Sequence, residues 1–291
     1  MPEPESAASV LILYVVPSPA VVYWAKVRVL TKAKKRDSVS LFIIFLFING
    51  CKGTTIIDNR QCIIDIYFVL LHSIMKDSVL ILSGGVDSTT LLYDEQERIA
   101  LAISFDYGSK HNAKEIPFAK WHCEQLGIRH IVIPLDFMTK YFVSSLLEGG
   151  EEIPEGHYAD ENMRSTVVPF RNGIMLSIAV GIAESNGLKY VMMANHGGDH
   201  TIYPDCTPQF VDAFDAAAAA GTFVKVHLRS PYTNITKADI ALRGKLLGID
   251  YQKTWSCYKG GEHHCGKCGT CVERKEAFAE AGIEDRTEYE A

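Results

Sequence analysis

The stretch of sequence that decides the fold is Ser78-Val-Leu-Ile-Leu-Ser-Gly-Gly-Val-Asp-Ser-Thr-Thr-Leu-Leu92. Its first part, Ser78–Leu82, is short and apolar, as expected of a buried strand. Gly84 and Gly85 then allow the backbone to turn sharply and to approach a ligand closely. A segment with helical character follows from Thr89, so the pattern is a strand, a glycine loop and a helix.

The same alternation of strands and helices continues along the chain. It predicts further strands at Leu101–Phe105, His130–Ile133, Tyr190–Ala194 and Phe223–Leu228. It predicts helices at Thr89–Arg98, Ala113–Leu126, Arg171–Asn186 and Pro208–Ala220, a helix from an N-cap at Thr236 through Leu247, and a long loop at 148–169. This order is typical of an α/β fold, a doubly wound parallel sheet with helices on both faces.

Ligands of such sheets lie at the carboxyl ends of the strands. Three polar segments follow predicted strands at that end: Ser83–Ser88, Asp106–Lys110 and Asn195–Asp205. We therefore expect these segments to form one site.

The loop Ser83–Ser88 has the features of an anion-binding loop. The helix after it presents free N–H groups and the positive end of its dipole, and the hydroxyl groups of Ser83 and Ser88 add donors. For Asp87 two interpretations are open, a helix cap and a ligand of Mg²⁺. The loop matches neither Gly-x-x-x-x-Gly-Lys-Ser/Thr nor Gly-x-Gly-x-x-Gly, so the alternative to a nucleotide site is an ordinary turn before a capped helix.

The composition is that of a globular protein with a hydrophobic core. The chain has 291 residues, of which 47% are hydrophobic and 22% are charged. Residues 75–291 hold 21 Lys and Arg against 30 Asp and Glu, a net charge of −9, whereas residues 1–74 have a net charge of +3. Domains that bind polyanions usually carry a basic surface, so this balance favours a small-molecule substrate and no nucleic acid.

Residues 1–74 lack the pattern of a folded domain. Their apolar runs Val10–Val16 and Leu41–Ile48 are shorter than the roughly 20 residues that a membrane-spanning helix needs, and their acidic start is unlike a signal peptide. We therefore expect no membrane association and a cytoplasmic location. An ordered pattern begins directly after Met75, so the hypothesis is that Met75 is the initiator and that 75–291 is the domain. A genuine N-terminal extension is the alternative.

Four of the eight cysteines lie close together near the C-terminus, at Cys257, Cys265, Cys268 and Cys271. The last three are separated by two residues each, with glycines between them, so a tight knuckle at 257–271 can point its sulfurs inward. Four thiolates suit one tetrahedral Zn²⁺ and leave no position for water, which indicates a structural ion. An iron–sulfur cluster and disulfides are the alternatives. His263 or His264 could replace a cysteine ligand, but exposed loop histidines are favoured.

The glycine loop resembles the PP-loop of the ATP pyrophosphatases. The resemblance implies an ATP site made of Leu82, Ser83, Gly84, Gly85, Val86, Asp87, Ser88 and Thr89, in which Ser83, Asp87 and Ser88 are the catalytic candidates. It implies that ATP is split between its α and β phosphates, which leaves an adenylate on a substrate oxygen. It also implies Mg²⁺ beside the phosphates and adenine near Ile103–Asp106.

Within that superfamily, residues 77–281 resemble the 7-cyano-7-deazaguanine synthase family, QueC. The similar stretches are dispersed and lie in one order: Leu82–Leu92, Val168–Ser177, Tyr203–Cys206, Thr236–Ile240, Thr254–Tyr258 and Cys265–Phe278.

The resemblance implies a reaction in queuosine precursor synthesis. ATP activates the carboxylate of 7-carboxy-7-deazaguanine, ammonia forms the amide, and a second activation with loss of water gives the nitrile. No glutaminase domain is visible in the sequence, so we expect free ammonia to be used. The resemblance also implies a homodimer.

Polar residues outside the loop are candidates for substrate contact: Arg171, Asn172, Asp199, Tyr203, Asp205 and Lys237. Arg171 and Asn172 could hold a phosphate or the substrate carboxylate, or they could be a surface arginine and a helix cap. The two aspartates could contact the guanine-like N–H edge or Mg²⁺, or they could be turn residues.

Four further residues have two interpretations each. Tyr203 could stack on the substrate rings or be a partly buried loop tyrosine, and Lys237 could contact a phosphate or be a solvated surface lysine. The thiol of Cys206 could be a nucleophile, but a small buried residue is favoured. His111 is interpreted as a loop histidine and not as a base.

Two other functions are compatible with parts of the sequence. One is a PP-loop enzyme that modifies tRNA by thiolation or lysidine formation, against which the acidic charge of the body counts. The other is a zinc-ribbon binding module in which the glycine loop is incidental, and absence of ATP binding would favour it.

Overall fold

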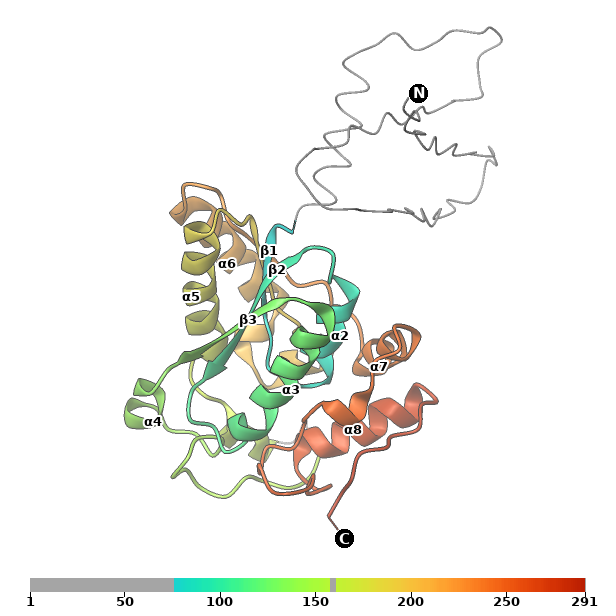
Figure 1. Cartoon of the computed structure of the whole chain (residues 1–291). Helices are drawn as coiled ribbons and strands as arrows, with labels where there is room; N and C mark the ends of the chain where they lie inside the picture. The colour runs from blue at the N-terminus through green and yellow to red at the C-terminus, as the bar shows by residue number, and fades with distance from the viewer. Residues whose placement is uncertain (1–75, 158–160, 291) are drawn as a thin grey trace, which may run out of the picture. The chain divides into compact units, whose positions relative to one another are not determined.

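The computed structural model describes residues 76–157 and 161–290 (Figure 1). The predictions for residues 1–74 and for an initiator at Met75 lie outside the described residues. The strands are β1 (Ser78–Ile81), β2 (Ile99–Asp106), β3 (Arg129–Pro134), β4 (Tyr190–Met192) and β5 (His227–Arg229).

The α-helices are α2 (Val86–Asp94), α3 (Asn112–Leu126), α4 (Phe137–Tyr141), α5 (Arg171–Ser185), α6 (Pro208–Gly221), α7 (Lys237–Leu246) and α8 (Gly269–Glu280). Short 3₁₀ helices occupy η1 (Glu161–Thr166), η2 (Gly197–Thr201), η3 (Pro204–Cys206) and η4 (Tyr251–Lys253).

The strands form one parallel sheet in the order β3-β2-β1-β4-β5. In the centre of the sheet, Val79 of β1 pairs with Leu101 of β2 and with Val191 of β4. The chain first builds outward from β1 to β3 and then crosses to β4 on the other side of β1. Because the winding direction changes there, the carboxyl ends of β1 and β4 form the place where ligands of such sheets bind.

Alternate residues of β1 belong to two separate hydrophobic cores. Val79 packs with Ile103 of β2 and Leu176 of α5 on one face of the sheet. Leu80 packs with Leu91 of α2 and Ile240 of α7 on the other face. All six side chains are fully buried, and each such burial contributes about 1.5–3 kcal/mol to the hydrophobic term. The two-sided core confirms the predicted α/β fold with helices on both faces of a parallel sheet.

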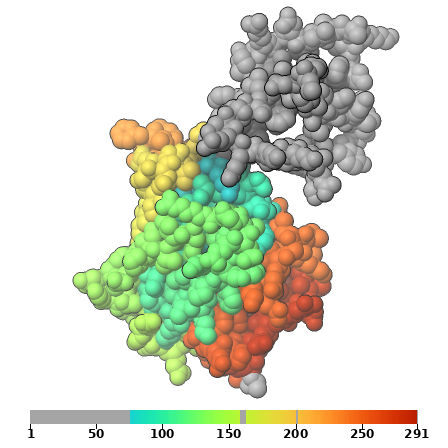
Figure 2. All heavy atoms as spheres, in the orientation of Figure 1, coloured from blue at the N-terminus to red at the C-terminus, as the bar shows by residue number. Residues whose placement is uncertain are grey.

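The helices divide between the two faces (Figure 1). Helices α5 and α6 pack against β1, β4 and β5, whereas α2, α7 and α8 form the opposite layer together with α3. Figure 2 shows the C-terminal residues, coloured orange to red, forming a continuous surface with the green segment that contains α3. The C-terminal helix is therefore part of the α/β body.

Helix ends follow local sequence signals. The Thr236 side chain caps α7 by accepting from the Asp239 N–H, while the Asp239 side chain accepts from the Thr236 N–H. Helix α3 ends at Gly127, which has a φ of +62°, a conformation that glycine adopts without strain. Both ends agree with the sequence analysis.

Several predicted boundaries were wrong. Strand β5 starts at His227, because Phe223 is fully exposed and Val224 is 41% exposed, so this apolar pair is not part of the sheet. Helix α2 begins at Val86, ahead of the predicted Thr89. The sequence analysis also missed α4.

One described helical stretch, Met163–Ser185, is long and apolar enough to cross a membrane. It contains α5, which packs on β1 and β4. We therefore interpret the stretch as a core helix of the sheet.

Candidate active site

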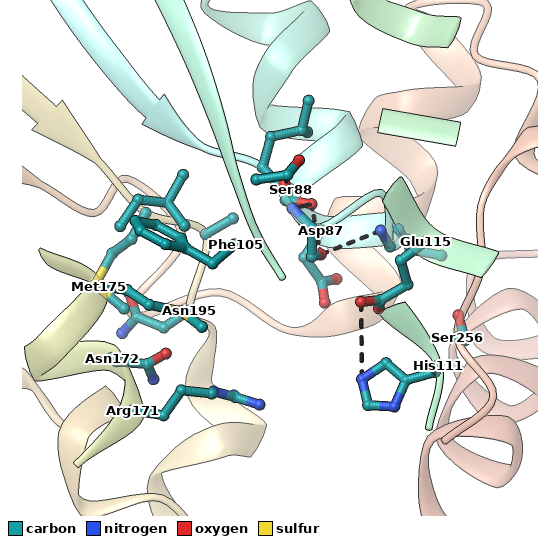
Figure 3. A pocket seen from close by; sticks show the side chains of 18 of the residues that line it. Asp87, Ser88, Phe105, His111, Glu115, Arg171, Asn172, Met175, Asn195 and Ser256 are labelled. Atoms are coloured by element: carbon teal, nitrogen blue, oxygen red, sulfur yellow. Dashed lines mark hydrogen bonds and ion pairs between the residues drawn. The ribbon is translucent and has the colours of Figure 1, made fainter. Parts of the chain in front are cut away.

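A cavity of about 1170 Å³, including its open mouth, lies at the carboxyl ends of β1, β2 and β4. Open α/β sheets bind small molecules in clefts at this end of the strands. Its charged and polar lining residues include Ser83, Asp87, Ser88, His111, Glu115, Arg171, Asn172, Asn195, Asp199, Tyr203 and Lys237. The structure thus brings all three predicted strand-end segments to one place, which we call the central cavity (Figure 3).

The glycine loop wraps around the hydroxyl group of Ser88. Ser88 Oγ accepts from the backbone N–H of Ser83 at 3.2 Å and from that of Gly84 at 3.4 Å, and it lies 3.0 Å from Ser83 Oγ. The two hydroxyl groups and the first turn of α2 therefore concentrate hydrogen-bond donors at one point of the cavity wall.

Gly84 is required by the packing of the loop. Its φ is +99°, and a Cβ at this position would lie 2.3 Å from the carbonyl oxygen of Glu115 on α3. Gly84 O also accepts from the Trp255 N–H at 3.0 Å. The loop is thus held between α3 and the segment that precedes the cysteine cluster.

Asp87 and Glu273 of α8 both form ion pairs with Lys237. Lys237 Nζ lies 3.1 Å from Asp87 Oδ2 and 2.7 Å from Glu273 Oε2. Burial alone would lower the pKa of Lys237, but the carboxylates of Asp87 and Glu273 raise it above its ordinary value. With its side chain only 13% exposed, Lys237 is not a solvated surface lysine.

The buried ring of His196 lies beside these ion pairs. Its Nδ1 accepts from the Gly198 N–H at 3.0 Å, so the ring proton is assigned to Nε2. Nε2 lies 3.5 Å from Glu273 Oε1 and 3.9 Å from Asp87 Oδ2. The sequence analysis included His196 only as part of a strand-end segment.

The opposite wall of the cavity is basic. Arg171 Nη1 donates to Tyr107 Oη at 3.1 Å, and the guanidinium lies over the Tyr107 ring. In Figure 3 Arg171 and Asn172 face the space into which Asp87 points. Arg171 is therefore held in position at the cavity wall and is not a surface arginine.

Asn172 and its neighbours are tied together at the start of α5. Asn172 Nδ2 donates to Cys206 Sγ at 3.1 Å, and the Asn172 N–H donates to Asp205 Oδ2 at 2.8 Å. Burial raises the pKa of the Cys206 thiol, which agrees with a small buried residue. Asp205 caps α5 and is not among the residues that line the cavity.

The remaining candidates also have local partners. Asp199 Oδ2 accepts from the His196 N–H at 3.0 Å, and Tyr203 Oη lies 3.1 Å from Tyr258 Oη. Asp199 and Tyr203 line the cavity, whereas Thr89, fully buried in α2, does not.

His111 and Glu115 form a buried pair that the sequence analysis missed. His111 N-caps α3, and its Nε2 lies 3.7 Å from Glu115 Oε2 and 3.4 Å from Tyr107 Oη (Figure 3). Burial raises the pKa of Glu115 to about 8, against the opposing charge of Arg171. Burial and then Arg171 lower the pKa of His111 to about 4. The available signal was the i, i+4 spacing directly after a strand-end segment.

The four clustered cysteines form a closed, buried group. The sulfur atoms of Cys257, Cys265, Cys268 and Cys271 all lie within 4.8 Å of one another. Cys257 Sγ and Cys268 Sγ are 4.0 Å apart, twice the length of a disulfide bond and close to the roughly 3.8 Å between thiolates around tetrahedral zinc. None of the cysteines in the described part of the chain is in a disulfide.

The two histidines near the cysteines differ. His263 is half-exposed, as expected, but His264 is only 5% exposed. His264 Nε2 accepts from the Ser256 N–H at 3.1 Å, and its ring lies 4.1 Å from that of Trp255. The expectation of an exposed loop histidine was therefore wrong for His264.

Arg274 connects the cysteine cluster with the body and was also missed. It is fully buried on α8, and its guanidinium donates to Thr254 Oγ1 and to Tyr251 O, each at 2.9 Å. Its Nε lies 3.4 Å from Asp285 Oδ1. A buried guanidinium with these partners fixes α8 against the segment that contacts the glycine loop.

Known proteins similar to this chain point to one family. The family model described as queuosine biosynthesis protein QueC matches residues 77–282. A 7-cyano-7-deazaguanine synthase of Porphyromonas gingivalis is 61% identical over 215 residues, which are 74% of this chain and 98% of that protein. Synthases of the same name from Desulfotalea psychrophila and Methanoregula boonei are 54% and 50% identical, over 74% and 73% of this chain and 99% of each relative.

Among solved structures, NMN synthetase from Francisella tularensis is similar with a TM-score of 0.41 and 12% identity, over 72% of this chain and 79% of that one. The sequence comparisons carry the assignment, because the family model matches residues 77–282 and the relatives agree in name. They support neither a thiolating or lysidine-forming enzyme nor a zinc-ribbon binding module. The chain is an enzyme that belongs to the QueC family of queuosine biosynthesis proteins.

Proposed function

We propose that this chain converts 7-carboxy-7-deazaguanine and ammonia into 7-cyano-7-deazaguanine with the consumption of ATP. The observation that carries the proposal is the central cavity, which has an anion-binding loop on one wall and Arg171 on the other. The names of the relatives supply the product. Activation of a carboxylate requires its oxygen to lie next to a phosphate of ATP. A phosphate held by the loop and a carboxylate held by Arg171 would lie next to each other in this cavity.

The glycine loop is proposed to hold the phosphates of ATP. Ser83, Gly85 and Ser88 line the cavity, and their N–H and hydroxyl groups lie at the positive end of α2. Donors fixed before the reaction stabilise charge that develops on the pyrophosphate as it leaves. Leu82 and Val86 border these donors, and buried Thr89 supports them from inside the helix.

Asp87 is proposed to bind Mg²⁺ together with the phosphates. Its Oδ1 is buried and has no hydrogen-bond partner, while Oδ2 pairs with Lys237. Mg²⁺ prefers carboxylate and phosphate oxygens, so the residues present fit the ion. When bound, it would offset the negative charge of the phosphates, and Lys237 would keep the carboxylate oriented.

The substrate carboxylate is proposed to bind at Arg171. The guanidinium can form two parallel bonds to a carboxylate, and its bond to Tyr107 Oη leaves other N–H groups available. A substrate oxygen held there can attack the α-phosphorus, and pyrophosphate leaves. Ammonia then attacks the carbonyl carbon, AMP leaves, and a second activation on the amide oxygen precedes nitrile formation.

Two cavity residues are proposed to orient the deazaguanine rings. Tyr203 supplies an aromatic ring to the cavity wall, and Asp199 of η2 supplies a carboxylate. Asn172 and Asp205 act behind Arg171, because they hold the first turn of α5.

The cysteine cluster is proposed to hold one structural Zn²⁺. Four buried sulfurs at tetrahedral spacing leave no open position. Zinc measured in a 1:1 ratio to protein is the expected result, and iron with visible absorption would favour the cluster alternative.

We further propose that the enzyme acts in the cytoplasm as a homodimer on small molecules. The net charge of −9 in residues 75–291 counts against a nucleic-acid partner. Sedimentation of the purified protein tests the dimer, and a monomer at micromolar concentration would contradict it.

The experiment that tests the function is direct. The protein is incubated with ATP, Mg²⁺, ammonium and 7-carboxy-7-deazaguanine, and the products are followed by mass. We expect the amide first and then the nitrile. Absence of both, with the metal bound and the protein folded, would overturn the proposal.

A further inference from the structure

Formation of a nitrile requires a base at the substrate nitrogen. An amide nitrogen carries two protons, and both must leave while the carbon–oxygen bond breaks. The N–H and hydroxyl groups of the glycine loop serve as donors to anions and cannot accept a proton from this nitrogen. Arg171 cannot accept it either, because its guanidinium is a permanent cation.

Glu115 is the carboxyl group best placed for this step. It lines the same cavity as Asp87 and Arg171, and Figure 3 shows its carboxyl group pointing into the space between them. Its own helix is packed on the glycine loop, because a Cβ on Gly84 would meet Glu115 O at 2.3 Å. Asp87 is unsuited to the role, because its Oδ2 is paired with Lys237 at 3.1 Å.

We propose that Glu115 accepts the proton that leaves the substrate nitrogen when the nitrile forms, and that His111 positions its carboxyl group. The proposal rests on the proposed function and assigns it a further catalytic residue. His111 Nε2 is 3.7 Å from Glu115 Oε2, which is longer than a hydrogen bond. Such contacts are often long without substrate and shorten in the complex.

The electrostatics of the pair agree with a base that works near neutral pH. The groups that face Glu115 are His111 on its own helix, Tyr107 after β2, Asp87 on α2 and Arg171 on α5. Burial raises the pKa of Glu115 to about 8, so its carboxylate is a stronger base than that of an exposed glutamate. The low pKa of His111, about 4, keeps the ring neutral, so it orients the carboxyl group without an added charge.

The step balances in atoms and charge. The amide oxygen, once adenylated, carries AMP as its leaving group, and the nitrogen loses its first proton to water in the open cavity as the imidate forms. Glu115 then takes the second proton, the nitrogen electron pair completes the triple bond, and the carbon–oxygen electron pair departs with AMP. Glu115 returns its proton to solvent through the open mouth of the cavity.

The test uses Glu115→Gln, which keeps size and hydrogen bonding but cannot accept the proton. The variant is supplied with the amide, Mg²⁺ and ATP, and two rates are measured: pyrophosphate–ATP exchange and nitrile formation. We expect exchange within about threefold of wild type and nitrile formation reduced about 100-fold or more, the usual contribution of a general base. Wild-type nitrile formation is expected to rise with pH toward about 8, and the variant is expected to lose this dependence.

The matched control is Glu124→Gln on the exposed side of the same helix, which is expected to leave both rates unchanged. His111→Gln, which retains an N–H donor, is expected to keep more activity than His111→Ala. An equal fall of exchange and nitrile formation in Glu115→Gln, or no fall in nitrile formation, would overturn the role of Glu115. Absence of nitrile in the wild-type protein would instead overturn the proposed function.

Discussion

At the scale of single residues, the proposed ATP site depends most on the loop around Ser88. One hydroxyl group bonds two backbone N–H groups and contacts a second hydroxyl. In this arrangement the loop is folded around an oxygen before any phosphate arrives. The same donors can therefore be transferred to a phosphate oxygen with little movement.

Replacing Ser88 with alanine is expected to lower kcat/KM for adenylation about 100-fold, the usual cost of losing one donor at a developing anion. Pyrophosphate–ATP exchange measures this step. Ser185→Ala is the control, since Ser185 Oγ is exposed and bonds only Gly181 O of its own helix. Full activity of the Ser88 variant would contradict the assignment of the loop.

Lys237 is expected to matter for stability as well as for Asp87. Lys237→Met leaves Asp87 and Glu273 near each other without their cation, and loss of one partner of a buried pair costs about 3–5 kcal/mol. Urea unfolding measures the change in free energy.

Two variants calibrate this cost. Lys120→Met, which breaks an exposed pair with Glu124, is expected to cost below about 1 kcal/mol. Adding Glu273→Gln to Lys237→Met is expected to recover part of the loss, because one uncompensated charge disappears. Equal losses of unfolding free energy for Lys237→Met and Lys120→Met would show that the ion pairs of Lys237 do not stabilise the fold.

Sequence alone located part of this site. Ser83, Asp87 and Ser88 follow a strand and stand out by type and spacing, and Arg171 and Asn172 lie within a stretch that resembles a known family. Glu115 and Glu273 do not stand out, since each helix carries at least one other glutamate, Glu124 on α3 and Glu276 on α8. Their importance comes from burial and from partners distant in sequence, which no local pattern contains.

At the scale of elements, α7 links α2 with α8, because its Lys237 pairs with both Asp87 and Glu273. Its N-cap Thr236 precedes Lys237, so the start of the helix fixes the bridging ammonium. The sequence analysis placed the N-cap at Thr236 and predicted this start correctly. The apolar run that predicted a strand at Phe223–Leu228 was misleading, because Phe223 and Val224 are exposed and β5 begins only at His227.

Thr236→Ala is expected to lower the free energy of unfolding by about 1 kcal/mol, because α7 loses its side-chain cap. Thermal unfolding with Thr236→Ser as the matched control measures it, since serine retains the hydroxyl group. Equal effects of the two substitutions would contradict the assigned cap.

At the scale of the whole molecule, the cysteine cluster is linked to the glycine loop by contacts of α8 and of the segment that precedes the cluster. Helix α8 starts at the cluster and carries Glu273 to Lys237, and the segment before the cluster donates from Trp255 to Gly84. A metal that closes the cluster would thereby hold two contacts of the glycine loop. The hypothesis of an initiator at Met75 stays a prediction at this scale.

Removal of the metal with a chelator is expected to weaken ATP binding at least tenfold and to speed hydrogen exchange of the Ser83–Ser88 amides. Both changes follow from loosening of α8 and of the Trp255 contact. Added Zn²⁺ is expected to restore both, and Mg²⁺ alone is not. Unchanged hydrogen exchange of these amides in the metal-free protein would show that the cluster does not stabilise the loop.

The central claim is that one loop activates first a carboxylate and then an amide. Its most direct test counts pyrophosphate and AMP per nitrile formed by the wild-type protein. The account predicts two of each per nitrile from 7-carboxy-7-deazaguanine and one of each from the amide. Release of ADP and phosphate, or nitrile formed from the amide without ATP, would contradict it.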